Sequence, residues 1–149
     1  MRLEPDTILI AEDDPNDALL VQRAFRTARL ANPIQVVGDG ERTIAYLSGV
    51  PPYDDREKYP LPMLVLLDLK MPRKGGHEVL EWIRAQPGIK RLPVVVLTSS
   101  SEMIDINRAY DLGANSYLVK PVEFEALLEM VKELNLYWAV MNKLGSVQE

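Results

Sequence analysis

Apolar residues along this chain follow two alternating patterns. Five short runs are rich in apolar residues, and the one that starts at Met63 is uninterrupted, as expected for a central strand of a parallel sheet that is covered on both faces. They span residues 7–11, 34–37, 63–67, 93–97 and 115–119. Between them, apolar residues recur at intervals of three or four positions, which predicts amphipathic helices. These helices are expected from Asp14 to before Pro33 and over residues 40–47, 76–86, 102–112 and 122–144.

The alternation of strand and helix predicts the fold class. Asp14 followed by Pro15 is typical of a helix start, with Asp14 as the N-cap and Pro15 at the first helical position. Five strand–helix units in 149 residues predict one α/β domain over residues 1–149. Its five-stranded parallel sheet would be doubly wound, with five helices on the two faces and right-handed crossovers.

Residues 50–62 interrupt this alternation. The segment contains four prolines and the charged run Asp-Asp-Arg-Glu-Lys at 54–58. Proline clusters favour irregular structure, so an insertion loop is predicted here. Such a loop is either a tolerated surface insertion or a segment that contacts a partner.

The last helix, predicted over 122–144 as an extended C-terminal helix, carries more apolar residues than one packed face needs. Either the 50–62 loop covers the excess, or the helix presents an interface to another protein. The second interpretation is favoured, and a two-fold homodimer through this helix face is its commonest form.

Composition removes several classes of function. The net charge of −5 argues against non-specific binding of nucleic acid or of an anionic membrane surface. Cysteine is absent, which excludes disulfides and thiolate chemistry. No apolar run reaches the length that spans a bilayer, and the first residues do not form a signal peptide pattern. A cytoplasmic location is the default expectation.

Charged residues follow three of the predicted strands. Glu12-Asp13-Asp14 follows the first, Asp68 the third and Lys120 the fifth. Open α/β sheets place their sites at these carboxyl ends of strands. Carboxylates gathered there repel one another unless a cation neutralises them or one of them is protonated, and a hard metal ion is expected.

The residue types suit Mg²⁺ and phosphoryl transfer. Asp13 and Asp68 could bind Mg²⁺ directly, Glu12 could hold a coordinated water, and the backbone carbonyl of Lys70 could add a ligand. Asp68 could accept a phosphoryl group as an acyl phosphate. The hydroxyl of Thr98 and the ammonium of Lys120 would then donate to the phosphoryl oxygens.

These residues together resemble the receiver domain of two-component response regulators, over roughly residues 6–140. The matching pieces are Ile-Leu-Ile-Ala-Glu-Asp-Asp at 8–14, Leu-Asp-Leu-Lys-Met-Pro at 67–72, Leu-Thr-Ser at 97–99 and Tyr-Leu-Val-Lys-Pro at 117–121. The resemblance implies a flavodoxin-like sheet of order 2-1-3-4-5, with Asp68 as phosphoacceptor and a histidine kinase as donor. It also implies that Tyr117 swings inward on phosphorylation, and that the Lys120–Pro121 bond is cis.

The long 50–62 loop and the long last helix make the chain similar to stand-alone, CheY-like receivers that serve bacterial phytochromes. No output domain is expected after the last helix, so signalling would pass through protein association with a downstream partner or through a phosphorelay. No sequence motif identifies the kinase, its stimulus or the downstream target. The sequence pattern also does not predict the phosphoryl lifetime or any link between phosphorylation and dimerisation.

The expected function is that of a phosphoacceptor signalling protein, not an enzyme, and two other functions are alternatives to it. A Mg²⁺-dependent aspartyl-phosphate phosphatase of the haloacid-dehalogenase type needs a carboxylate two residues after the nucleophile, where this chain has Lys70. A receiver-shaped docking scaffold that is never phosphorylated needs none of the residues Glu12, Asp13, Asp68, Thr98 and Lys120, all of which are present.

Overall fold

The computed structural model describes residues 6–141, 145 and 147, and in this part of the chain the five predicted strands form one parallel sheet. The strands are β1 (Ile8–Ala11), β2 (Ile34–Val37), β3 (Leu64–Leu67), β4 (Val94–Thr98) and β5 (Ser116–Val119). Their order is β2-β1-β3-β4-β5, and every neighbouring pair is parallel. The predicted doubly wound fold and its strand order are confirmed.

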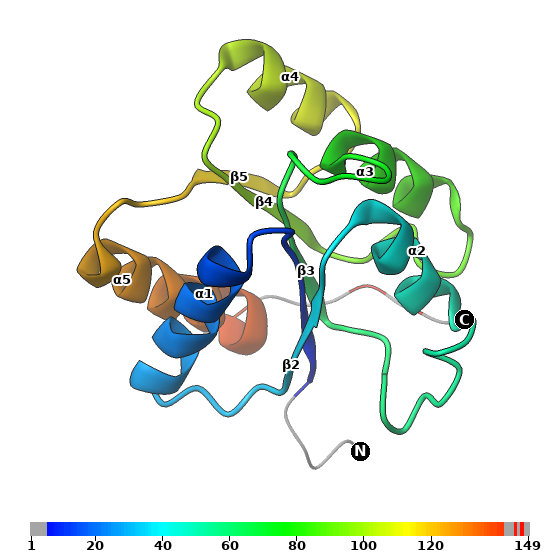
Figure 1. Ribbon diagram of the computed structural model, residues 1–149, viewed down its shortest axis with the longest axis horizontal. Coiled ribbons are helices and arrows are strands. Elements are labelled where there is room, and N and C mark those ends of the chain that lie inside the picture. The colour runs from blue at the N-terminus through cyan, green and yellow to red at the C-terminus, as the bar shows by residue number, and fades with distance from the viewer. Residues whose placement is uncertain (1–5, 142–144, 146, 148–149) are drawn as a thin grey trace.

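The helices cover both faces of the sheet. They are α1 (Pro15–Thr27), α2 (Gly40–Ser48), α3 (Gly76–Ala85), α4 (Met103–Asp111) and α5 (Phe124–Leu134), followed by a π-helical segment, η1 (Asn135–Met141). Figure 1 shows α1 and α5 side by side on one face, with α2 and α3 on the other and α4 beyond them. The last α-helix begins two residues later than expected and changes to π-helix at Asn135, and residues 142–144 lie outside the described residues.

Successive strand residues point to opposite faces, and this alternation builds two large apolar cores, with a third, small cluster of Leu69, Val96 and Ala109 beside α4. Ile10 and Leu66 are among the side chains that pack under α1 and α5, together with Trp138 of η1. Leu9 and Val65 belong to the second cluster, under α2 and α3. The central strands are therefore buried on both faces, which explains why their sequences are continuously apolar.

Residues 50–62 lack a regular element but are held firmly against α2. The guanidinium of Arg56 donates hydrogen bonds to the carbonyl oxygens of Tyr46 and Leu47, at 2.8 and 2.9 Å, at the end of that helix. The rings of Tyr53 and Tyr59 pack on Tyr46, with centroids 5.2 and 5.9 Å from it. The segment thus lies on the α2 side of the sheet, and the interpretation that it covers the last helix is wrong.

A side-chain N-cap marks the start of α1 and of α2, but not of α3, α4 or α5. The Asp14 carboxylate accepts a hydrogen bond of 2.8 Å from the Asn16 amide, so Asp14 is the N-cap of α1 as predicted. Helix α4 starts after Glu102, which makes no side-chain capping bond. Over the described residues, none of the helices is both long and apolar enough to traverse a bilayer.

Candidate functional site

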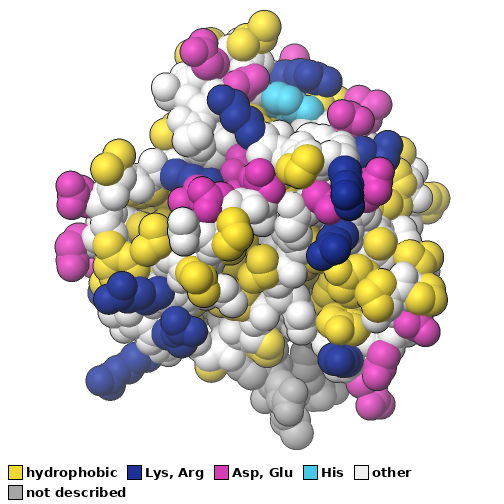
Figure 2. Space-filling model, viewed as in Figure 1, with side chains coloured by type: hydrophobic (Ala, Val, Ile, Leu, Met, Phe, Trp, Pro, Cys, Tyr) yellow, Lys and Arg dark blue, Asp and Glu magenta, His cyan; other side chains and the backbone are white. Residues whose placement is uncertain are grey.

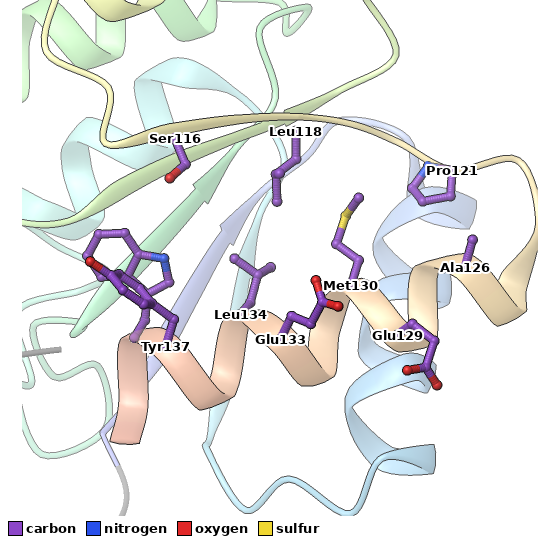
Figure 3. Close-up of a pocket in the computed structure, with 10 residues that line it drawn as sticks. Ser116, Leu118, Pro121, Ala126, Glu129, Met130, Glu133, Leu134 and Tyr137 are labelled. Carbon is purple, nitrogen blue, oxygen red and sulfur yellow. The ribbon is translucent and has the colours of Figure 1, made fainter. Parts of the chain in front are cut away.

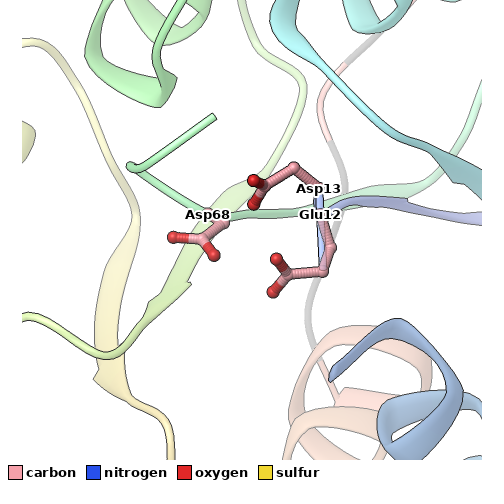
Figure 4. Close-up of side chains that lie close together, drawn as sticks. All are labelled: Glu12, Asp13 and Asp68. Atoms are coloured by element: carbon pink, nitrogen blue, oxygen red, sulfur yellow. The ribbon is translucent and has the colours of Figure 1, made fainter. Parts of the chain in front are cut away.

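Three carboxylates meet at the carboxyl edge of the sheet. Glu12 and Asp13 follow β1, and Asp68 follows β3, which is paired with β1 in register. One oxygen of each carboxylate lies within 4.8 Å of the other two. Figure 4 shows the three side chains turned toward a common space. Glu12 and Asp68 are buried, whereas Asp13 is exposed, so the group is open to solvent on one side.

Donors from the neighbouring strands converge on Asp68. The hydroxyl of Thr98, the last residue of β4, donates to Asp68 Oδ1 at 2.7 Å. The Lys70 backbone amide donates to the same oxygen at 3.1 Å. The ammonium of Lys120, just after β5, donates to Asp68 Oδ2 at 2.9 Å. Both oxygens of this carboxylate are therefore held in fixed directions.

Lys120 binds more than Asp68. Its ammonium also donates to Glu12 and, at 3.0 Å, to Asp17 in the first turn of α1. The Lys120 side chain is only 15% exposed, and the three hydrogens of its ammonium each have a carboxylate partner. Sequence analysis did not identify Asp17, because an acidic residue in the first turn of a helix is common for its interaction with the helix dipole.

The electrostatics of the group follow from burial and from the shared lysine. Burial raises the pKa of Glu12 to about 7, against the opposing hydrogen bond from Lys120. Burial also acts to raise the pKa of Asp68, but the hydrogen bonds from Lys120 and Thr98 outweigh it, so the pKa of Asp68 lies below its ordinary value. Burial would lower the pKa of Lys120, but its carboxylate partners raise that pKa above the ordinary lysine value. Asp68 is thus ionised and Lys120 charged at neutral pH.

An all-oxygen donor set of this kind fits a hard divalent cation. Three carboxylates, those of Glu12, Asp17 and Asp68, bind the single ammonium of Lys120, and the Asp13 carboxylate lies beside those of Glu12 and Asp68, so the group carries excess negative charge. Figure 2 shows acidic side chains gathered near the middle of this face, with Lys and Arg side chains beside them. The Lys70 side chain is exposed, and the contact that its residue makes with the group is through the backbone.

A second group of hydrogen bonds begins two residues beyond Thr98. The Tyr117 hydroxyl donates to the Ser100 carbonyl oxygen at 2.9 Å, and the Ser100 hydroxyl donates to the Asp105 carboxylate at 2.6 Å. Ser100 lies two residues beyond Thr98, and Asp105 is in α4. This hydrogen-bonded chain joins β5, the β4–α4 loop and α4. The sequence contained no signal for it, since the serines at 99–101 are typical of any loop.

The structure brings together Glu12, Asp13, Asp68, Thr98 and Lys120, as the sequence predicted, and it places Tyr117 one loop away from them. The expected cis bond at Lys120–Pro121 is not present, and among the described residues the cis bond is Pro51–Pro52.

Comparison with known proteins agrees with this geometry. The family model of the response regulator receiver domain matches residues 8–132. The chain is 39% identical over 140 residues to a probable methanogenesis regulatory protein, FilR2, of Methanothrix harundinacea, covering 94% of this chain and 88% of that protein. It is 38% identical over 134 residues to the response regulator Rcp1 of Synechocystis, covering 90% and 89% of the two chains.

Two solved structures are similar over nearly the whole chain. The phosphorylated cyanobacterial phytochrome response regulator RcpA superposes with a TM-score of 0.87 at 35% identity, over 95% of this chain and 99% of the other. The Mn²⁺-bound form of Rcp1 gives a TM-score of 0.84 at 37% identity, over 95% and 100%. With the strand order, the acidic group and these matches in agreement, the chain belongs to the response regulator receiver domain family of two-component signalling.

Proposed function

We propose that this protein is a response regulator whose receiver domain accepts a phosphoryl group on Asp68 from a histidine kinase. The observation that carries the proposal is the environment of Asp68. Its carboxylate is 6% exposed, lies between two other carboxylates and a lysine, and has both oxygens hydrogen-bonded in fixed directions. A carboxylate that only capped a loop would need none of these partners.

The transfer requires few protein groups. An oxygen of the ionised Asp68 carboxylate attacks the phosphorus of a phosphohistidine, the P–N bond breaks, and the bonding pair leaves with the imidazole. The product is an acyl phosphate on Asp68. Thr98 and Lys120 already donate to the two Asp68 oxygens, so the same donors lie next to the incoming phosphoryl oxygens. Lys120 supplies positive charge that stabilises the added negative charge.

Glu12, Asp13 and Asp68, with the backbone carbonyl of Lys70, would hold Mg²⁺. A bound Mg²⁺ would neutralise charge on the phosphoryl oxygens, as metals do in phosphoryl transfer. The Mn²⁺-bound relative supports this assignment, because Mn²⁺ and Mg²⁺ share a preference for oxygen ligands.

The proposal is tested by intact-mass analysis after incubation with acetyl phosphate and Mg²⁺. Wild type and Asp111→Asn, which alters an exposed aspartate of α4, should each gain one phosphoryl group. Asp68→Asn should gain none, and a chelator should prevent the gain in wild type and Asp111→Asn. Equal phosphorylation of wild type and Asp68→Asn would assign the acceptor elsewhere. No gain in any metal-bound variant would favour the docking scaffold.

The phosphate donor is proposed to be a phytochrome-type sensor kinase, acting in the cytoplasm. The similarity to a phytochrome response regulator supports this choice. The first helix offers a docking surface beside the site, because Leu19 and Leu20 are 57% and 41% exposed on α1. Purified phytochrome-type kinases should phosphorylate the wild-type protein readily. In the same reaction time, other sensor kinases should transfer only a trace of phosphate to it.

We also propose that two copies associate through the face formed by β5, α5 and η1. An open groove of about 590 Å³ lies between these elements (Figure 3). It is lined mostly by apolar side chains, among them Leu118, Met130, Leu134, Tyr137 and Trp138. Leu136 and Tyr137 are about half exposed at its end, as expected of a surface that a partner covers.

Sedimentation equilibrium tests this association with a matched pair of tyrosines. Tyr137 is 52% exposed at the groove, and Tyr110 is 49% exposed on α4. Tyr137→Asp should sediment as a monomer, whereas Tyr110→Asp should remain a dimer like wild type. A wild type that is monomeric both with and without phosphorylation would contradict the proposal.

A further inference from the structure

Asp17 occupies a position that the proposed phosphoryl chemistry does not require. It lies in the first turn of α1, outside the group of three carboxylates that could hold a metal. Its carboxylate oxygen Oδ2 accepts a hydrogen bond of 3.0 Å from Lys120 Nζ. The side chain is 38% exposed, so burial alone does not force this contact.

We propose that Asp17 is a positioning residue that holds the Lys120 ammonium between α1 and Asp68 and thereby limits how strongly the site retains a phosphoryl group. The inference deepens the proposed function and rests on phosphoryl acceptance at Asp68. It concerns the balance between the phosphorylated and unphosphorylated forms, not the chemistry of transfer itself.

The hydrogen-bonding capacity of Lys120 is the first reason. An ammonium has three N–H donors, and here they go to Glu12, Asp17 and Asp68. After transfer, the new phosphoryl oxygens need donors from the same ammonium. Asp17 then competes with them for Lys120, because it keeps one donor and pulls the ammonium toward α1.

Charge is the second reason. Transfer replaces the single negative charge of Asp68 with about two on the acyl phosphate, by analogy with other phosphorylated side chains. A fixed carboxylate bound to the same ammonium therefore opposes the phosphorylated form more than the unphosphorylated form. Replacing Asp17 by an uncharged residue of the same shape should shift the balance toward phosphorylation.

The test compares three variants with wild type at saturating Mg²⁺, using acetyl phosphate as the donor. Asp17→Asn removes the charge, and Asp17→Glu keeps it. Asp14→Asn removes the same charge three residues earlier, where the carboxylate caps α1 and has no bond to Lys120. Intact mass gives the rate constants for uptake and for spontaneous loss of the phosphoryl group. Thermal unfolding checks that each variant is folded.

The ratio of uptake to loss should rise about fivefold in Asp17→Asn, the change expected from removing an ion pair of about 1 kcal/mol. Asp17→Glu should restore the wild-type ratio, and Asp14→Asn should stay within about twofold of wild type.

A wild-type ratio in Asp17→Asn, or equal increases in Asp17→Asn and Asp14→Asn, would overturn the inference while leaving the proposed function intact. An increase in Asp17→Glu as large as that in Asp17→Asn would also overturn it, because charge would not be the cause. If wild type takes up no phosphoryl group, the proposed function fails and the inference fails with it.

Discussion

The centre of the sheet and its β5 edge are built very differently. Every residue of β3 and β4 is buried, whereas β5 has three half-buried residues and one exposed residue. Helix α3 buries four residues, but α4 buries only Ala109 and exposes Met103 and Ile104 by 65% and 76%. Asp68 and Thr98 extend from the densely packed part, and Tyr117 lies in the lightly packed part.

In the proposed function, this difference separates the two tasks of a phosphorylation switch. A carboxylate that accepts a phosphoryl group needs a fixed position, and close packing of β3 and β4 holds Asp68 and its donor Thr98 in place. A segment that reports the event must change conformation at small energetic cost, and few buried contacts make that possible. The hydrogen-bonded chain of Tyr117, Ser100 and Asp105 joins β5 to α4 through the β4–α4 loop, which begins directly after Thr98 of the site.

The largest expected effect is on stability. Leu66 is 1% exposed in the core, and Ile104 is 76% exposed on α4. Leu66→Ala should lower the free energy of unfolding by about 3 kcal/mol, because it removes buried contacts and leaves a cavity. Ile104→Ala removes as many carbon atoms and should change it by less than about 0.5 kcal/mol. Urea denaturation measures both, and similar losses would contradict the contrast in packing.

The next effect tests how burial controls the acidic group. The pKa of Glu12 is raised to about 7, so a proton competes with the metal below that pH. Affinity for Mg²⁺ should rise about tenfold between pH 6 and 8, as measured by calorimetry at constant ionic strength. In Glu12→Gln the affinity should be weaker and nearly independent of pH in this range. A flat profile in wild type would show that Glu12 is already ionised at pH 6.

A rise in pH, which should strengthen Mg²⁺ binding through Glu12, should lower the folding stability of the metal-free protein through the same carboxyl group. Its pKa in the folded state lies above the ordinary value of 4.5, so the folded state binds the proton more tightly than the unfolded state does. The contribution of Glu12 to stability is therefore complete below about pH 4.5 and is lost as the pH rises to about 7. Mg²⁺ should offset this loss, since it favours the ionised form.

The smallest effect concerns the link to α4. Tyr117→Phe keeps the ring but removes the hydrogen bond to the Ser100 carbonyl oxygen. It should lower the free energy of unfolding by about 1 kcal/mol. Amide hydrogen exchange should become faster in the β4–α4 loop and α4, and stay unchanged in β3. Equal acceleration in β3 would show that the centre of the sheet and the α4–β5 region open together, which would contradict their difference in packing.

The centre of the sheet could be predicted from sequence because its signals are strong and local. Continuous apolar runs at β1, β3 and β4, each ending in or followed by a polar residue, predicted a parallel sheet with Asp13, Asp68 and Thr98 at its carboxyl edge. The resemblance to receiver domains supplied the strand order that brings these residues together. Strand order places these ends side by side, whatever the details of the loops.

The remaining features depend on contacts between segments that are far apart in the chain. Asp17 meets Lys120 across 103 positions, and Arg56 reaches back to the end of α2. An aspartate in the first turn of a helix and an arginine in a loop are both common, so no local pattern marks Asp17 or Arg56 as a residue with a long-range partner. The π-helical segment that starts at Asn135 likewise continues an apolar, helix-forming sequence, so no local pattern marks the change from α-helix. The structure shows that Trp138 of this segment packs on the core.

The most direct test of the central claim is to locate the phosphoryl group. After reaction with acetyl phosphate and Mg²⁺, borohydride reduces an acyl phosphate of aspartate to homoserine, and peptide mass spectrometry then finds the altered residue. Homoserine at position 68, and at no other aspartate, is the predicted result. Modification at Asp13 or Asp17 instead, with Asp68 unchanged, would contradict the assignment of Asp68 as the phosphoacceptor.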